Sequence, residues 1–349
     1  MTLCPARLEP VFSPRPWGSR SLAPFFPEML NLIEPIGEAW MTGNTSRFAN
    51  GPFEGKTLGE VWPHISSDWA GTSLEHGDFP LLVKFIFPED KLSVQVHPDD
   101  AYAARHEQAA GGRGKTEMWY VVAARPGAKV LVGLKSDVTR ESFTRSISEG
   151  TAENCLDAIP LGPGEGVFVP AGTAHTIGPG FVLCEIQQSS DLTYRVYDYN
   201  RRDANGQSRP LHIEKALDVM RFGTQSAGKI TPVPTKRGHL TETHYAVCRY
   251  FATEHWSFAL RVEAASLPER FDLLVFLEGW GHIAWAAQRA AYRPAQVWLI
   301  PAALGSFELV PEVRTSLLRT YVPGDLKELK QKLFERGVSE AQWLSLVHL

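Results

Sequence analysis

The chain has 349 residues, which suffices for one large domain or two medium-sized ones. Hydrophobic residues make up 44% of it and charged residues 21%, as in ordinary globular proteins, and no apolar run approaches the roughly 18 residues of a membrane span. The formal net charge is −4 with no basic tract, which argues against nucleic acid as the main partner, because phosphate backbones are bound by clustered Lys and Arg.

The four cysteines are scattered, and none forms a CxxC pair. This pattern argues against a disulfide framework and against a cysteine-ligated metal. Residues 1–10 lack the basic segment and the apolar segment of a secretory signal. We therefore expect a cytoplasmic protein with reduced thiols.

The first half of the chain reads as short strands with a few helices. Residues 1–75 are rich in Pro, Gly and Trp, which predicts short strands and turns with a brief helix at 58–61. From residue 79 on, short apolar or alternating runs separated by Gly and Pro turns are typical of a β-sandwich or barrel. The predicted strands cover 81–87, 92–97, 118–123, 129–134, 166–169 and 181–187. Helices are predicted at 99–108 and 139–149.

The second half repeats this texture after a helix at 213–222 and a turn-rich linker at 223–237. A second strand-rich block spans about 240–322, and two helices follow at 325–334 and 339–347. Residues 164–171 and 292–302 share a loose cadence, which is weak internal similarity. We predict a mainly β chain of two related barrels with a few peripheral helices, divided as residues 1–225 and 226–349.

One strand carries an unusual polar face. Ser93, Gln95 and His97 alternate with apolar residues, so their side chains point to the same side of the strand. Glu117 begins a later strand, and His175 follows a tight turn. Gln95, His97, Glu117 and His175 together offer one neutral oxygen, two imidazoles and one carboxylate, a set that suits an open divalent metal site. Zinc is the default, and a mononuclear Fe(II) site stays open as the alternative.

Other residues have simpler interpretations. A single histidine is more often a surface or core residue than a ligand, and seven others without such companions are predicted to be structural: His106, His212, His239, His244, His255, His282 and His348. The second barrel shows no corresponding set of His and Glu. Lys84 lies within an apolar strand, which is costly unless it faces a pocket or a partner, although a solvated edge lysine is the alternative.

Four segments together resemble the type I mannose-6-phosphate isomerase family: residues 80–85, 92–99, 114–120 and 169–175. The N-terminal segments 15–18 and 37–40 fit the same family, as do 197–201 and 211–213, and the match thins after about residue 225. Only 57 residues separate Glu117 from His175, which resembles the short bacterial form. The combination of the metal-site motifs is highly specific.

This resemblance implies a cupin fold with two jelly-roll barrels and a zinc ion held by Gln95, His97, Glu117 and His175. It implies the interconversion of mannose 6-phosphate and fructose 6-phosphate, with Arg195 as the active-site arginine. It also implies that Ser93 and Arg201 hold the phosphate, where family members commonly carry a lysine in place of Arg201.

The implied reaction moves a proton between C1 and C2 through a cis-enediolate, so the site needs a base. Glu185 is the first choice, with a salt-bridge role as its alternative. Lys115 would act as acid or proton shuttle, and Asp191 would orient Arg195 or assist ring opening. Arg195 stays protonated and is assigned to charge stabilisation and substrate positioning, and Lys84 to substrate binding.

Two other functions remain open at this stage. The chain could be a sugar-binding or regulatory cupin without turnover, or a cupin isomerase for a different sugar phosphate. Retention of Lys115, Glu185, Asp191 and Arg195 argues against the non-catalytic alternative. The expected partner is a small phosphosugar, with no nucleic acid and no membrane, and a homodimer is a possible assembly.

Overall fold

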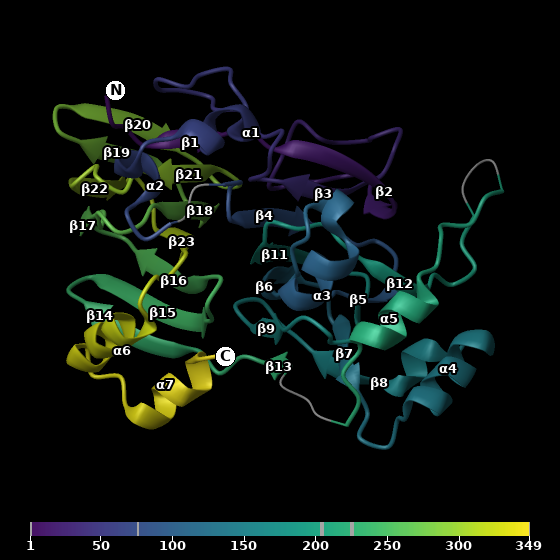
Figure 1. The fold of residues 1–349 in the computed structure, drawn as a ribbon. Coiled ribbons are helices and arrows are strands. Elements are labelled where there is room, and N and C mark those ends of the chain that lie inside the picture. Colours follow the sequence, from purple (N-terminus) through teal and green to yellow (C-terminus); the bar gives the residue numbers. More distant parts are fainter. Residues whose placement is uncertain (1, 75–76, 203–205, 224–226, 349) are drawn as a thin grey trace.

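The computed structural model describes residues 2–74, 77–202, 206–223 and 227–348, whose strands form four antiparallel sheets (Figure 1). The sheets are grouped as two sandwiches, each with a seven-stranded sheet and a smaller one. Within the described residues, we find no helix that is both long and apolar enough to span a membrane.

The first sandwich pairs a seven-stranded sheet with a five-stranded one. In spatial order, the large sheet contains β13 (Gly228–Lys229), β9 (Gly166–Val169), β6 (Glu117–Ala124), β11 (Phe181–Gln188), β4 (Leu81–Ile86), β3 (Ile36–Trp40) and β2 (Val11–Ser19). The small sheet contains β12 (Tyr194–Tyr197), β5 (Val94–Val96), β10 (His175–Ile177), β7 (Lys129–Leu134) and β8 (Leu156–Pro160).

The second sandwich pairs a seven-stranded sheet with a four-stranded one. The large sheet contains β1 (Ala6–Leu8), β21 (Val297–Ile300), β18 (Asp272–Glu278), β23 (Thr315–Tyr321), β16 (Ala252–Phe258), β15 (Leu240–Val247) and β14 (Val233–Arg237). The small sheet contains β17 (Val262–Ala265), β22 (Ser306–Pro311), β19 (Gly281–Trp285) and β20 (Gln288–Tyr292).

The two large sheets have the same topology, and each takes one edge strand from elsewhere in the chain. Strands β9 and β21, which carry the similar segments noted in the sequence, hold the same place in their sheets. Beyond β21 lies β1 from the N-terminus, and beyond β9 lies β13 from the segment that leads to the second sandwich. The internal similarity therefore reflects a repeated architecture.

The large sheet of the first sandwich is apolar on both faces, because it packs on both sides. Met118 and Ile186 point outward and join a core cluster shared with the second sandwich. Trp119 and Leu183, which lie one and three positions away on the same strands, point inward and join the cluster between the two sheets. Any ionisable residue on that inner face is consequently buried and needs a partner.

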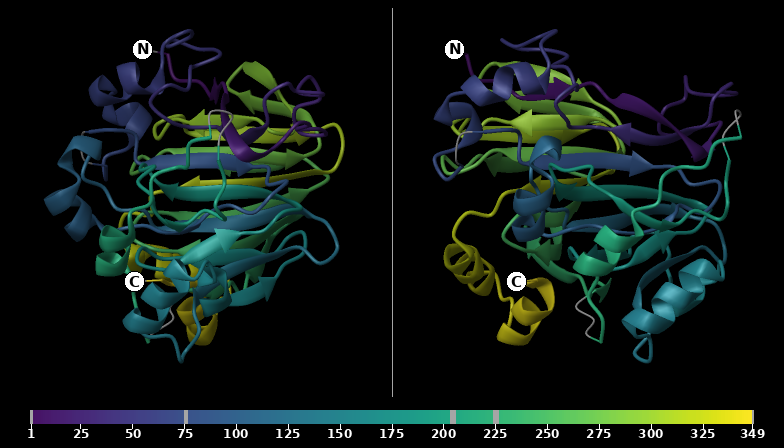
Figure 2. Two further views of the ribbon diagram at one scale, coloured as in Figure 1. Left: turned by 90° about the vertical axis from the view of Figure 1, so that its right-hand side faces the viewer. Right: turned by 45° about the vertical axis from the view of Figure 1, so that its right-hand side comes forward.

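Helices lie at the margins of the sheets (Figure 2). They are α1 (Leu58–Val61), α2 (Ser67–Ala70), α3 (Asp100–His106), α4 (Arg140–Ser148), α5 (Ile213–Val219), α6 (Leu326–Glu335) and α7 (Glu340–Leu346). Asp99, Thr139, Asp325 and Ser339 each accept a backbone N–H as the N-cap, as short polar side chains do at helix starts. The predicted mainly β fold with few helices is confirmed, and in place of the two predicted barrels the structure shows two sandwiches of paired sheets.

The linker predicted at 223–237 is wrong in part, because this segment contains β13 and β14. Proline in the sequence suggested turns, but Pro234 lies on β14 at the edge of its sheet. An edge strand tolerates proline because no outer neighbour needs its N–H. The predicted boundary between residues 225 and 226 lies outside the described residues and stays a prediction.

Candidate active site

Two rows of side chains face each other inside the first sandwich. Across β4, β11 and β6, Lys84 pairs in register with Glu185, and Glu185 with Trp119. Across β12, β5 and β10 of the opposite sheet, Arg195 pairs with Gln95, and Gln95 with His175. Directly opposed residues lie close enough for their side chains to interact. The register alone therefore gathers five of the predicted site residues.

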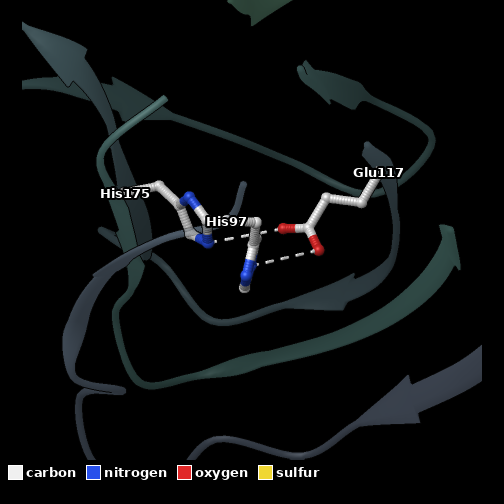
Figure 3. Close-up of side chains that lie close together, drawn as sticks. All are labelled: His97, Glu117 and His175. Carbon is white, nitrogen blue, oxygen red and sulfur yellow. Dashed lines mark ion pairs between the residues drawn. The ribbon is translucent and has the colours of Figure 1, made fainter. Parts of the chain in front are cut away.

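His97, Glu117 and His175 meet in a fully buried cluster (Figure 3). The Nε2 atom of His97 lies 3.6 Å from one oxygen of Glu117, and Nε2 of His175 lies 3.4 Å from the other. His175 reaches this place through a turn at Gly172, whose φ of +85° and close approach to the Val219 carbonyl leave no room for a side chain.

The two imidazoles are oriented as metal ligands are. Nδ1 of His97 donates to the Leu192 carbonyl at 2.8 Å, and Nδ1 of His175 donates to the Thr173 carbonyl at 2.9 Å. These bonds leave both Nε2 atoms as acceptors that face Glu117, the arrangement that outer hydrogen bonds impose on ligating histidines. Burial, followed by Lys115, holds the pKa of His97 well below its usual value and lowers that of His175 to about 4, so both rings are neutral.

Glu117 completes the donor set with two buried oxygens. Oε2 has the ammonium of Lys115 2.6 Å away, whereas Oε1 has no hydrogen-bond donor among the described residues. A buried carboxylate oxygen without a donor is costly, and a divalent cation would remove that cost. Two neutral imidazoles and one such carboxylate fit a zinc ion. Gln95 lies beside them, with its Nε2 3.2 Å from Nε2 of His175. Its amide must turn over for the oxygen to act as the predicted fourth ligand.

Lys115 brings a positive charge next to the cluster. Its buried Nζ lies 2.6 Å from Glu117 Oε2, 3.3 Å from Nε2 of His97 and 3.5 Å from Glu185 Oε1. Burial alone lowers the pKa of Lys115, but the carboxylates of Glu117 and Glu185 outweigh it and hold the pKa above its usual value. The ammonium therefore stays charged within reach of both acids.

Glu185 is a buried carboxyl held between Trp119 and two lysines. The indole Nε1 of Trp119 donates to Oε2 at 3.0 Å, and Nζ of Lys84 lies 3.9 Å from Oε1. Burial and the nearby Glu117 charge raise the pKa of Glu185 above its ordinary value, against the opposing effect of the lysines. A raised pKa brings this carboxyl closer to the range of a general base at neutral pH.

Lys84 has partners, so the solvated-edge alternative does not apply. Its Nζ lies 2.7 Å from Asp191 Oδ1 and 3.8 Å from Glu38 Oε2, and the side chain is 2% exposed. Burial lowers the pKa of Lys84, but Asp191 and Glu38 outweigh it and raise the pKa above normal. Asp191 therefore pairs with Lys84, whereas the sequence suggested an orienting contact to Arg195.

A cavity of about 480 Å³ opens in front of these residues. Its walls include Lys84, Ser93, Gln95, Lys115, Glu185, Asp191 and Arg195, together with Arg15, Trp17, Glu38, Arg209 and His212. Nε of Arg195 donates to Ser93 Oγ at 3.3 Å, and Nη1 donates to the Pro210 carbonyl at 3.1 Å. Among the described residues, Arg195 has no carboxylate within ion-pair distance. Seven of the predicted site residues thus line one cavity, and the cluster of His97, Glu117 and His175 lies behind them.

Arg201 does not line this cavity. Its Nη2 lies 2.6 Å from Asp198 Oδ1, and its Nη1 donates to the Lys91 carbonyl at 2.6 Å. Arg209 binds the same Asp198 through two bonds of 2.6 and 2.7 Å and does line the cavity. A direct contact of Arg201 with phosphate stays a prediction, while Arg209 is the cation that this loop presents to the cavity.

Four ionisable cavity residues were missed by sequence reasoning: Arg209, described above, and Arg15, Glu38 and His212. Arg15 and Glu38 form a two-bond ion pair across β2 and β3, with both distances 3.1 Å. His212, predicted to be structural, accepts the backbone N–H of Arg195 at 3.3 Å and lines the cavity. The available signal was position, because the family-like segments 15–18 and 37–40 and the loop after Arg195 contain these residues.

The second sandwich carries its own His and Glu cluster, which corrects the expectation that it has none. Glu242, His244 and Glu254 are buried and close together. Arginines neutralise the two acids: Arg237 and Arg336 contact Glu242, and Arg319 lies 3.0 Å from Glu254. The cluster is therefore a buried ion network that connects the sheet to the segment after α6.

Comparison with known proteins shows which family and which relatives this chain resembles. The family model described as "Phosphomannose isomerase type I, catalytic domain" matches residues 6–154. The mannose-6-phosphate isomerase ManA of Bacillus subtilis is 34% identical over 322 residues, which cover 88% of this chain and 96% of that protein.

Solved structures agree with this match. The crystal structure of mannose 6-phosphate isomerase from Bacillus subtilis has a TM-score of 0.82 and 30% identity, covering 90% of this chain and 99% of that one. A mannose 6-phosphate isomerase bound with zinc and yttrium has a TM-score of 0.69 and 17% identity, covering 91% and 99%, and shows the shared fold. By its sequence, its fold and its buried His and Glu cluster, this chain belongs to the type I phosphomannose isomerase family.

Proposed function

We propose that this chain interconverts mannose 6-phosphate and fructose 6-phosphate with the help of one zinc ion. The observation that carries the proposal is the contact between the buried cluster and the cavity. Gln95 and Lys115 line the cavity and touch His175 and Glu117 on its far side. A sugar in the cavity would lie next to a metal, a carboxyl base and an arginine at once.

The metal would be held by His97, Glu117 and His175, with Gln95 as the fourth ligand after its amide turns. One carboxylate and three neutral ligands would leave zinc a net charge near +1, and bound zinc would supply positive charge that favours oxygen anions on the substrate. The oriented imidazoles and the Glu117 Oε1 atom, which has no hydrogen-bond donor among the described residues, support this assignment.

The phosphate would bind near Arg195 and Ser93, at the end of the cavity where cations gather. Arg195 has two hydrogen bonds to neutral oxygens, so its guanidinium keeps donors and charge for an anion. Burial, then the neighbouring Arg209 and Arg15, lower the pKa of Arg195, which indicates a surplus of positive charge that a phosphate would offset. Arg201 would act through Asp198, which it shares with Arg209.

Proton transfer would use Glu185 as the base and Lys115 as the acid. Oε2 of Glu185 is occupied by Trp119, so Oε1, on the side of Lys115 and Lys84, would take the proton that moves between C1 and C2. Lys115 would stabilise or protonate the substrate oxygen as charge develops. Lys84 and Asp191, paired at 2.7 Å, would bind the sugar or assist ring opening.

The direct test is an aldose–ketose interconversion assay with metal content measured on the same sample. We expect zinc-loaded protein to convert mannose 6-phosphate to fructose 6-phosphate, and chelated protein to lose and then regain activity with zinc. A parallel series of other phosphosugars and of unphosphorylated mannose would reveal an isomerase of different specificity. Zinc-loaded protein that converts none of these sugars would sink the proposal.

A location and an assembly complete the proposal. We propose a cytoplasmic enzyme, consistent with four cysteines that are all free thiols in the structure. A homodimer is proposed as the assembly, and light scattering at micromolar concentration would decide between one chain and two.

A further inference from the structure

A hydrogen-bond network centred on Asp100 connects the second sandwich to the active-site segment. Asp100 is the first residue of α3, directly after the segment that contains His97. Its Oδ2 accepts the Tyr250 hydroxyl at 2.6 Å and an Arg249 N–H at 3.0 Å. Both of these residues lie in the loop between β15 and β16, so they reach over from the second sandwich.

The other oxygen of Asp100 holds the segment that carries Lys115. Oδ1 accepts the Gly114 backbone N–H at 2.9 Å and a Gln188 side-chain N–H at 2.9 Å. Gln188 in turn accepts the Thr116 backbone N–H at 2.8 Å. The residues on both sides of Lys115 are therefore fixed by side chains of this network.

The approach of this segment to Asp100 is so close that only glycine fits. A Cβ atom on Gly114 would lie 2.6 Å from the backbone nitrogen of Asp100. Real side-chain contacts do not come this near, so the chain at residue 114 is pressed against the start of α3. A contact of this kind transmits a small shift of Asp100 to the neighbouring residue.

Lys115 depends on this network more than Glu117 does. Glu117 is the first residue of β6 and pairs in register with Val169 and Gln187 on both sides. Lys115 precedes the strand and has one backbone bond of its own, from its N–H to the Pro98 carbonyl at 3.0 Å. Its ammonium nevertheless lies 2.6 Å from Glu117 and 3.5 Å from Glu185, distances that tolerate little displacement.

We propose that Tyr250 is a positioning residue for Lys115, and that the second sandwich sets the geometry of the active site through the contact of Tyr250 with Asp100. This inference rests on the proposed isomerase function for its kinetic consequence. The geometric part, a restrained backbone at residues 114–116, stands without it.

The test compares Tyr250→Phe with Tyr292→Phe. Tyr292→Phe is the control because it also removes a tyrosine hydroxyl. Tyr292 is buried in the second sandwich, and its hydroxyl lies 3.0 Å from the Thr315 hydroxyl of the same sandwich. For Tyr250→Phe we expect kcat to fall about 10-fold, the usual size for a lost supporting contact at a site. KM for mannose 6-phosphate and the zinc content should match the wild type, and Tyr292→Phe should keep kcat.

Hydrogen exchange gives a readout that does not depend on turnover. The backbone amides of Gly114 and Thr116 should exchange faster in Tyr250→Phe than in the wild type or in Tyr292→Phe. Should Tyr250→Phe fold poorly, Asp100→Asn gives the same test, because it keeps the shape and removes the charge that strengthens all four bonds.

The outcomes separate this inference from the proposed function. Wild-type protein without isomerase activity would refute the proposed function. The exchange rates of Gly114 and Thr116 would still show whether Tyr250 restrains the backbone at residues 114–116. Unchanged exchange at these amides, or an equal loss of kcat in both tyrosine variants, would overturn the positioning role of Tyr250.

Discussion

Lys84 and Glu185 lie directly opposite each other on neighbouring strands, and both side chains are buried. Two opposite charges placed in this way inside a sheet usually form an ion pair with each other. Here the two charged groups are 3.9 Å apart, and each has a closer partner, Asp191 for the lysine and Trp119 for the glutamate. Oε1 of Glu185 therefore has no ammonium in direct contact: among the described residues, the nearest is that of Lys115 at 3.5 Å, followed by that of Lys84 at 3.9 Å.

This relationship predicts the effect of Glu185→Gln. The amide keeps the shape and can still accept the Trp119 N–H, but it cannot take a proton. We expect kcat for mannose 6-phosphate to fall about 100- to 10,000-fold, the range for loss of a general base. Zinc content should stay at one ion per chain.

Lys84→Met separates the two interpretations of Glu185. If Glu185 only balances charge, removing the lysine should impair folding as much as Glu185→Gln does, with matched losses in melting temperature. If Glu185 is the base, Lys84→Met should mainly raise KM. Turnover by Glu185→Gln within threefold of wild type would contradict the assignment.

Removal of a metal ligand should remove the metal. His97→Ala and Glu117→Ala should each reduce bound zinc after dialysis from one ion per chain to a small fraction, because each would leave two strong ligands. Atomic absorption on the dialysed protein measures this directly. His106→Ala, which changes an exposed histidine on α3, is the matched control and should keep the full zinc content.

Arg195→Ala should behave differently from the ligand variants. It should greatly reduce turnover while zinc stays bound, since Arg195 contacts Ser93 and Pro210 and none of His97, Glu117 and His175. Loss of zinc in this variant would show that the arginine supports the metal centre instead.

Arg209 offers a test of where the phosphate binds. Arg209→Ala should raise KM for mannose 6-phosphate about 10- to 100-fold, as expected when a hydrogen bond between two charged groups is lost. The structural reason is that Arg209 lines the cavity and is oriented there by Asp198. Arg202→Ala, at an exposed neighbouring position, is the control and should leave KM unchanged.

Acid should destabilise the protein through His255. Burial beneath the ring of Tyr120 lowers the pKa of His255 to about 4, against 6.5 for an unperturbed histidine. Between these two values the unfolded chain binds a proton that the folded chain does not. Stability is therefore full above pH 6.5 and is lost as the pH falls towards 4.

The measurement is the free energy of unfolding in urea at pH 7 and pH 5. The wild type should lose about 1–2 kcal/mol more than His255→Gln over this interval, because glutamine does not titrate. The exposed His239→Gln is the control and should follow the wild type. A pH dependence unaltered by His255→Gln would show that other groups dominate.

The local elements could be predicted from sequence because they depend on short-range patterns. The meeting of His97, Glu117 and His175, which come from distant segments, was indicated by their residue types and by the family-like segments that contain them. Period-two alternation placed β5 and the common face of Gln95 and His97, and cap residues placed the starts of α3, α6 and α7. The edge strand β14 was missed because its proline is acceptable only where one side of the strand has no neighbour, which is a tertiary fact.

The missed site residues have the same kind of explanation. His212 reaches the cavity because the loop after β12 folds back onto Arg195, which spacing in the sequence does not reveal. The cluster of Glu242, His244 and Glu254 did have a signal, since alternate residues on one strand face their partners across the next hairpin strand. That signal shows which side chains meet, but it does not show that Arg237, Arg319 and Arg336 would neutralise the two glutamates.

The exchanged edge strands have a consequence for synthesis of the chain. Strand β1 is synthesised long before its partner β21, which ends at Ile300. Before β21 exists, β1 can bond only to the segment around Phe48, and the second sandwich cannot complete its large sheet until both strands are present. Contacts so distant in sequence slow folding and leave a strand exposed to wrong partners in the meantime. Shortening this chain from its N-terminus should thus damage first the sandwich that is made last.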